Sequence, residues 1–235
     1  MRFQDAAPDA RAIVYAGIQA DPLVARAAGL LADATPDQRV LARAAMNGMS
    51  TDAAVWRIVF PNLFGPAASA GPERERSESI LGASLAVAER GELVRQQVRG
   101  AIVEELTERL VRRRAGAGAG AGSAEATGSA PSVRRERRIL FDGVRAEFHP
   151  YDVTVETPGA AEAIDCKWGA RGINADVLHQ LDDARTHAVD EEERLVVTLV
   201  VFDARRSCDV RLARQTAPSE ATRVITIETL DDLAR

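Results

Sequence analysis

The chain has 235 residues, of which 46% are hydrophobic and 28% are charged. This composition excludes a wholly disordered chain and suffices for one medium domain, or for a small domain with an appended part. The formal net charge of −5 argues against a protein that coats nucleic acid non-specifically, because such a coat needs many cationic contacts. A locally basic groove remains compatible with this charge.

The sequence contains no sign of a membrane or secretory protein. Its apolar runs are shorter than the roughly 18–20 residues of a spanning helix, and residues 1–9 lack the apolar stretch of a signal peptide. Two cysteines, Cys166 and Cys208, do not make a disulfide framework. We therefore expect a cytoplasmic protein that does not bind membranes. Lys167 is the only lysine among the 30 basic residues, and all the others are arginines.

Residues 1–72 are predicted to form a small helical domain. Apolar residues recur at helical spacing through residues 12–31. Thr35 and Pro36 then form a helix start, because threonine is a good N-cap and proline fits the first helical position. Residues 64–72 are rich in glycine and proline and mark the end of this domain.

Residues 73–235 are predicted to form an α/β domain. Apolar residues four apart, from Val94 to Leu110, favour one long helix over residues 77–114, or two helices joined at Gly91. The small residues of the stretch 115–131 bury little surface, which predicts a flexible loop. After this loop the pattern predicts three strands, a helix, a strand, and a final strand and helix, at residues 138–149, 152–156, 161–168, 176–188, 195–202, 224–227 and 230–234. This order is typical of helices packed around a mixed central sheet.

Two acids and the single lysine fall on the second and third of these strands. Asp165 and Lys167 are separated by one residue, so their side chains leave the same face of a strand. If the two strands pair, Asp152 lies on the same side. Neighbouring carboxylates are costly unless a cation lies between them, and Mg²⁺ prefers such oxygen ligands. The pattern predicts a metal site at which Lys167 orients or activates a water.

The residues of this site belong to two short stretches, Pro150-Tyr151-Asp152 and Asp165-Cys166-Lys167. Together they resemble the motif of the PD-(D/E)xK nuclease superfamily, although a tyrosine separates the proline from the first acid here. The predicted order of elements over about residues 90–235 is also similar to the αβββαβ core of that superfamily. The resemblance thus implies a restriction-endonuclease-like α/β fold with a mixed central sheet, preceded by the N-terminal helical domain.

The resemblance implies a Mg²⁺-dependent endonuclease, with Mn²⁺ as a substitute, that hydrolyses phosphodiester bonds in DNA. Restriction or another antiviral defence is the biology that it suggests first, with DNA repair or junction resolution as the alternative. Asp152 and Asp165 would bind the metal, and Lys167 would act on the attacking water. Members of the superfamily commonly work as dimers, so we expect a homodimer or a higher homo-oligomer.

Three further residues enter through the same resemblance. The superfamily often adds a glutamate from its first helix as a catalytic residue and metal ligand, and Glu104 and Glu105 are both candidates here. Some members also place a glutamine in the helix after the lysine strand, which implies a catalytic role for Gln180.

The isolated lysine supports the nuclease hypothesis. Arginine is permanently charged and planar, whereas lysine is a compact ammonium that can change its protonation state. In a chain that otherwise uses arginine, a site that accepts only lysine would retain Lys167. The alternative hypothesis is a non-catalytic module that binds nucleic acid or protein on a nuclease-like scaffold, which agrees with the acidic net charge.

Overall fold

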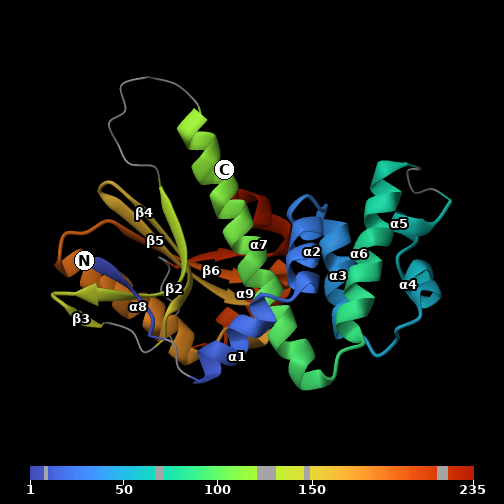
Figure 1. The fold of residues 1–235 in the computed structure, drawn as a ribbon, viewed down its shortest axis with the longest axis horizontal. Helices are drawn as coiled ribbons and strands as arrows, with labels where there is room; N and C mark the ends of the chain where they lie inside the picture. The colour runs from blue at the N-terminus through green and yellow to red at the C-terminus, as the bar shows by residue number, and fades with distance from the viewer. Residues whose placement is uncertain (8–9, 67–70, 121–130, 146–148, 216–221) are drawn as a thin grey trace. The chain divides into compact units, whose positions relative to one another are not determined.

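The protein is a mixed α/β structure, seen in a computed structural model (Figure 1). The structure describes residues 1–7, 10–66, 71–120, 131–145, 149–215 and 222–235. Contacts divide the chain into a helical unit, Asp9–Leu106, and a sheet unit, made of Met1–Pro8 and Thr107–Arg235. The division falls inside a single helix, α7 (Glu92–Gly120), which continues from one unit into the other. In the part of the chain that the structure describes, no helix is long and apolar enough to cross a membrane.

In its described residues, the helical unit contains six helices and the first part of α7. They are α1 (Ala10–Gln19), α2 (Pro22–Ala32), α3 (Pro36–Asn47), α4 (Ala53–Val59), α5 (Pro61–Phe64) and α6 (Pro72–Ala88). The predicted start of α3 is confirmed, since the Thr35 side chain accepts a hydrogen bond from Gln38 N and Pro36 occupies the first turn. The Gln38 side chain bonds back to the main chain of Thr35 and completes a capping box.

Helix α6 belongs with the helices before it. Leu81 and Leu85 of α6 are buried in one hydrophobic cluster with Leu41 and Ala45 of α3. The two units therefore separate after Leu106, whereas the sequence suggested a boundary after residue 72. The breaker-rich stretch is a connection inside the helical unit, because the apolar face of α6 is covered by α2 and α3.

One mixed sheet of seven strands forms the centre of the sheet unit. Its strands are β1 (Arg2–Asp5), β2 (Ser132–Phe141), β3 (Val144–Arg145), β4 (Tyr151–Thr157), β5 (Ala160–Lys167), β6 (Leu195–Val201) and β7 (Arg223–Ile225). They lie in the order β1-β2-β4-β5-β6-β7, with β3 paired to β2. The pairs from β1 to β5 are antiparallel, and β6 and β7 run parallel to β5. The parallel pair of β5 and β6 requires a crossover, which α8 supplies.

Helix α8 (Ala175–Asp190) packs on one face of this sheet. Its buried Leu181 and Ala184 share a core with Ala163 of β5 and with Leu199 and Val201 of β6. Asn174 caps the helix by accepting a hydrogen bond from Val177 N. Three short helical segments complete the unit: η1 (Ala170–Gly172), α9 (Arg205–Leu212) and η2 (Ile227–Leu233).

Side chains of α7 contact the residues of β5 that alternate with this core. Cys166 Sγ lies 3.4 Å from Thr107 Oγ1, and Arg114 Nη2 lies 2.5 Å from Glu162 Oε2. Glu162 is 8% exposed and also accepts a hydrogen bond of 2.9 Å from Thr198. Successive residues of a strand point to opposite faces, so β5 separates the α8 core from the α7 contacts.

Most predicted elements from residue 152 onward are confirmed within two residues of their ends, as β4, β5, α8, β6 and β7. The last predicted helix is the 3-10 segment η2. The first predicted strand was placed too late, because β2 begins at Ser132 and ends at Phe141; residues 146–148 of that prediction lie outside the described residues. The predicted loop was wrong over residues 115–120, which continue α7; every second residue there is alanine, the strongest helix former. Residues 121–130 of that loop also lie outside the described residues.

The pair formed by buried Glu162 and half-buried Arg114 should be important for stability. Arg114→Met leaves a buried carboxylate without its cation, so we expect the free energy of unfolding to fall by about 3 kcal/mol. Urea unfolding followed by circular dichroism measures this loss. Arg205→Met is the control, because it removes an exposed pair with Asp209 and should cost about 0.5 kcal/mol or less. Equal losses in the two variants would contradict the assignment.

Candidate functional site

Asp165 and Lys167 meet at the end of β5. The Lys167 Nζ lies 2.6 Å from Asp165 Oδ2, and Asp165 is only 8% exposed. Burial acts to lower the pKa of Lys167, but the charges of Asp165 and Asp152 outweigh it and hold this pKa above its usual value. Lys167 is therefore an ammonium at neutral pH, directed onto a carboxylate.

Asp152 is tied to the same stretch of β5 from the neighbouring strand. Its Oδ2 accepts a hydrogen bond of 2.6 Å from the main-chain N–H of Cys166, the residue between Asp165 and Lys167. The main-chain register of β4 and β5 begins at Val153 and Ile164, so Asp152 lies one residue before the paired part of β4 and Cys166 lies two residues after the paired part of β5. The carboxylate of Asp152 thus satisfies an N–H donor where the regular pairing stops.

Glu136 is opposite Asp152 on the other neighbouring strand. The register of β2 and β4 pairs Arg135 with Val153 and Arg137 with Tyr151, so Glu136 and Asp152 hold the positions in between. Glu136 has a φ of +53°, which is uncommon for a residue other than glycine. Such a left-handed residue in a strand changes the direction in which side chains point, as in a β-bulge.

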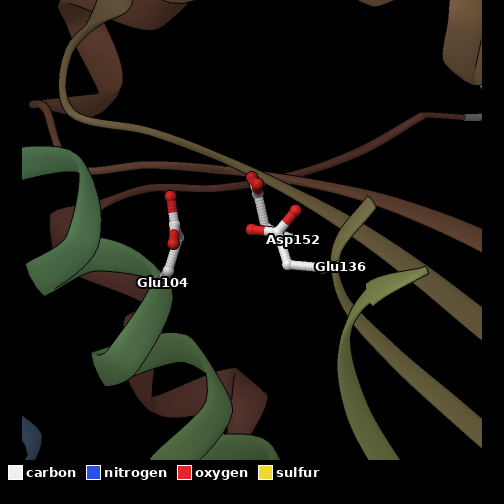
Figure 2. Close-up of side chains that lie close together, drawn as sticks. All are labelled: Glu104, Glu136 and Asp152. Atoms are coloured by element: carbon white, nitrogen blue, oxygen red, sulfur yellow. The ribbon is translucent and has the colours of Figure 1, made fainter. Parts of the chain in front are cut away.

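Three carboxylates come together around this point. Figure 2 shows Glu104, Glu136 and Asp152, whose oxygens lie within 4.8 Å of one another. Glu104 stands on α7 one turn before Glu108, and Glu108 is paired with Arg135 of β2. Like charges at this spacing repel, and a divalent cation would offset the repulsion. An all-oxygen donor set of this kind fits Mg²⁺ or Mn²⁺.

Of the two glutamates that the sequence left open, Glu104 is the one beside Asp152. It is 6% exposed, whereas Glu105 is half-buried and lies outside the group of three carboxylates. Within the helical unit, Glu104 accepts hydrogen bonds of 2.5 Å from Tyr15 Oη and 2.9 Å from Gln19 Nε2. These two donors from α1 fix the orientation of the Glu104 carboxylate.

Gln180 contacts the residues just before Asp152. Its side-chain Nε2 donates a hydrogen bond of 3.1 Å to the carbonyl oxygen of His149, and its own carbonyl accepts from Tyr151 Oη at 3.4 Å. Both contacts hold the chain where β4 begins, next to Asp152. The side-chain amide contacts main chain and none of the acids, so its geometry differs from the catalytic role that the resemblance implied.

Glu136 was missed by the sequence reasoning. The predicted strand began at residue 138, two residues after it, and a single left-handed residue leaves no regular pattern in a sequence. The available signal was one acid inside the basic run from Arg134 to Arg138. An acid within such a run is conspicuous on a strand next to Asp152.

Comparison with known proteins adds little to this geometry. No protein-family model matches the chain, and no curated protein matches it. Among solved structures, the chain is similar to the crystal structure of protein VC1899 from Vibrio cholerae, with 18% sequence identity and a TM-score of 0.43. The match covers 99% of this chain and 56% of that one, so the chain spans little more than half of its length.

Divalent metal should stabilise the folded protein through these acids. At ten times its Kd, a bound ion raises the free energy of unfolding by about 1.4 kcal/mol, which thermal unfolding with and without Mg²⁺ or Mn²⁺ detects. Asp152→Asn retains an acceptor for Cys166 N–H but loses the charge, so we expect it to abolish the effect. Asp183→Asn, which changes an exposed acid of α8, should respond like the wild type. An unchanged response of Asp152→Asn would contradict the site.

Proposed function

We propose that this chain is a metal-dependent endonuclease that hydrolyses phosphodiester bonds in DNA. The observation that supports it most is the joint attachment of Asp152, Asp165 and Lys167. Asp152 binds the N–H of the residue between the other two, and Lys167 contacts Asp165 at 2.6 Å. These are the acids and the lysine of the two stretches that resemble the PD-(D/E)xK motif.

We extend the proposal to the fold of the sheet unit. The series α7, β2, β4, β5, α8 and β6 has the αβββαβ order of a restriction-endonuclease-like core. Three antiparallel strands followed by a helical crossover to a parallel strand agree with that order. The elements added to this core are β1, β3, β7 and α9. The acids Glu136, Asp152 and Asp165 lie on the central strands β2, β4 and β5.

In the proposed mechanism, Asp152 and Asp165 would hold a Mg²⁺ ion, as the resemblance implies, and the carboxylates of Glu104 and Glu136 lie near that of Asp152. The bound metal would polarise the phosphate and lower the pKa of a water. The ammonium of Lys167 would orient this water and stabilise the charge that develops on the phosphate. Because the neighbouring carboxylates keep it protonated, Lys167 acts through its charge and its N–H donors.

The proposal includes DNA as the substrate and a homodimer or higher oligomer as the active form. One site of this kind cuts one strand at a time, so cleavage of both strands of a duplex is simplest with two copies of the chain. Restriction or another antiviral defence is the corresponding biological role.

Cleavage of supercoiled plasmid in Mg²⁺ or Mn²⁺ tests the activity directly. We expect Asp165→Asn and Lys167→Met to lower the nicking rate at least about 100-fold, because each removes a charge from the proposed reaction centre. Lys167→Arg should also be impaired, since a planar guanidinium does not reproduce a compact ammonium. Asp183→Asn serves as the control and should keep the wild-type rate.

If the wild type cuts neither DNA nor RNA with any of these ions, the nuclease proposal is wrong. Metal-independent binding of nucleic acid or of a protein by such an inactive chain would favour the non-catalytic module. Cleavage that persists in Asp165→Asn would exclude this site as the source of the activity.

The pair Glu104 and Glu105 offers a matched test on a single helix. Glu104→Gln removes a charge beside Asp152, and we expect about 10- to 100-fold slower plasmid nicking. Glu105→Gln makes the same chemical change at the neighbouring position and should stay within about twofold of the wild type. The reverse ranking would show that the other face of α7 serves the site.

A further inference from the structure

Gly172 lies against the side chain of Lys167. A Cβ atom added at Gly172 would stand 2.9 Å from Cβ, Cγ and Cδ of Lys167, closer than real Cβ contacts come. The three atoms belong to the part of the side chain nearest to the main chain, so a rotation of the flexible end would not relieve the overlap. The Lys167 side chain can therefore lie here only because residue 172 has no side chain.

The reason for glycine at this position is space. Among the described glycines, a left-handed φ occurs at Gly71, Gly143 and Gly159, and Gly172 is outside that group. An alanine would therefore find its backbone conformation at residue 172 acceptable. Only the contact with Lys167 opposes it.

Hydrogen bonds hold the main chain of η1 and of Lys167 in place on the two sides of this contact. Ala170 N donates a hydrogen bond of 2.9 Å to Asp203 Oδ2, which ties η1 to the end of β6. The carbonyl of Ile173, which is fully buried, accepts from Arg211 Nε at 2.8 Å. On the other side, the carbonyl of Lys167 accepts from Phe202 N at 2.8 Å. The gap between η1 and the lysine is thus fixed by hydrogen bonds on both sides.

We propose that Gly172 is a positioning residue, which directs the stem of Lys167 so that its ammonium reaches Asp165. The main chain of η1 forms one wall along the stem, and Asp203 holds that wall in place. The effect on catalysis rests on the proposed nuclease function, whereas the effect of Gly172 on the position of the Lys167 side chain does not. Gly172→Ala should displace the ammonium and leave the rest of the sheet unit folded.

The single lysine allows this displacement to be observed directly. Protein grown with [13Cε]-lysine gives one methylene signal in a 13C–1H NMR spectrum, that of Lys167. We expect Gly172→Ala to shift this signal by more than its line width. Gly116→Ala is the control, because it adds the same methyl group to α7 where no atom lies within 4 Å, and it should leave the signal unchanged.

Kinetics give a second readout. With plasmid as substrate, Gly172→Ala should lower kcat about 10- to 100-fold and change KM less than twofold, since misplacing a reacting group by about 1 Å costs this much without weakening substrate binding. A variant that is merely less stable would recover the wild-type kcat on cooling, with an unshifted lysine signal. That result would overturn the proposal.

The wild-type protein provides a test that needs no variant. A nuclear Overhauser effect between the Gly172 Hα protons and the Lys167 side-chain protons is expected, and its absence would overturn the proposal even if Gly172→Ala fails to fold. If the wild type cuts no nucleic acid but Gly172→Ala shifts the lysine signal, the nuclease function fails and the positioning role stands. An unshifted signal in a folded Gly172→Ala protein rejects the positioning role whatever the activity.

Discussion

A carboxylate bonded to a strand N–H organises the whole candidate site. Between β4 and β5, Asp152 Oδ2 accepts the hydrogen bond that a main-chain carbonyl would accept in a regular antiparallel pair. This contact fixes an acid beside the residue that separates Asp165 from Lys167. It also explains how a half-buried acid is tolerated here, because a charge-assisted hydrogen bond offsets part of the cost of removing the charge from water.

Among the described residues of the sheet unit, two acids are buried, Glu162 and Asp165. Glu162 is paired with Arg114, in a contact that a forked guanidinium makes well. Asp165 is paired with the lysine instead. A compact ammonium and a planar guanidinium differ in shape and in hydration, so an arginine at residue 167 would not reproduce this contact with Asp165.

How far the sequence could predict this site depends on the range of the interactions involved. The common face of Asp165 and Lys167 follows from strand alternation alone, and the place of Asp152 follows from the pairing of consecutive strands. Glu136 depends on one left-handed residue, and the choice between Glu104 and Glu105 depends on the rotation of a long helix about its axis. Neither is set by local periodicity. The limits of α7 were misjudged for a related reason, since glycine content alone does not end an alanine-rich helix.

The strand β1 has a consequence for the order in which the molecule folds. It pairs with β2, and the carbonyl of Phe3 accepts a hydrogen bond from Arg137, 134 positions further along the chain. The helical unit is thus an insertion between two segments of the sheet unit. During synthesis β1 has no strand to pair with until the helical unit and β2 have been made. The β1 edge of the sheet therefore forms only after β2 has been synthesised. Pairing β1 with β2 closes a long loop, but the entropy cost of closure grows only slowly with loop length, so the length of the inserted unit adds little to this cost.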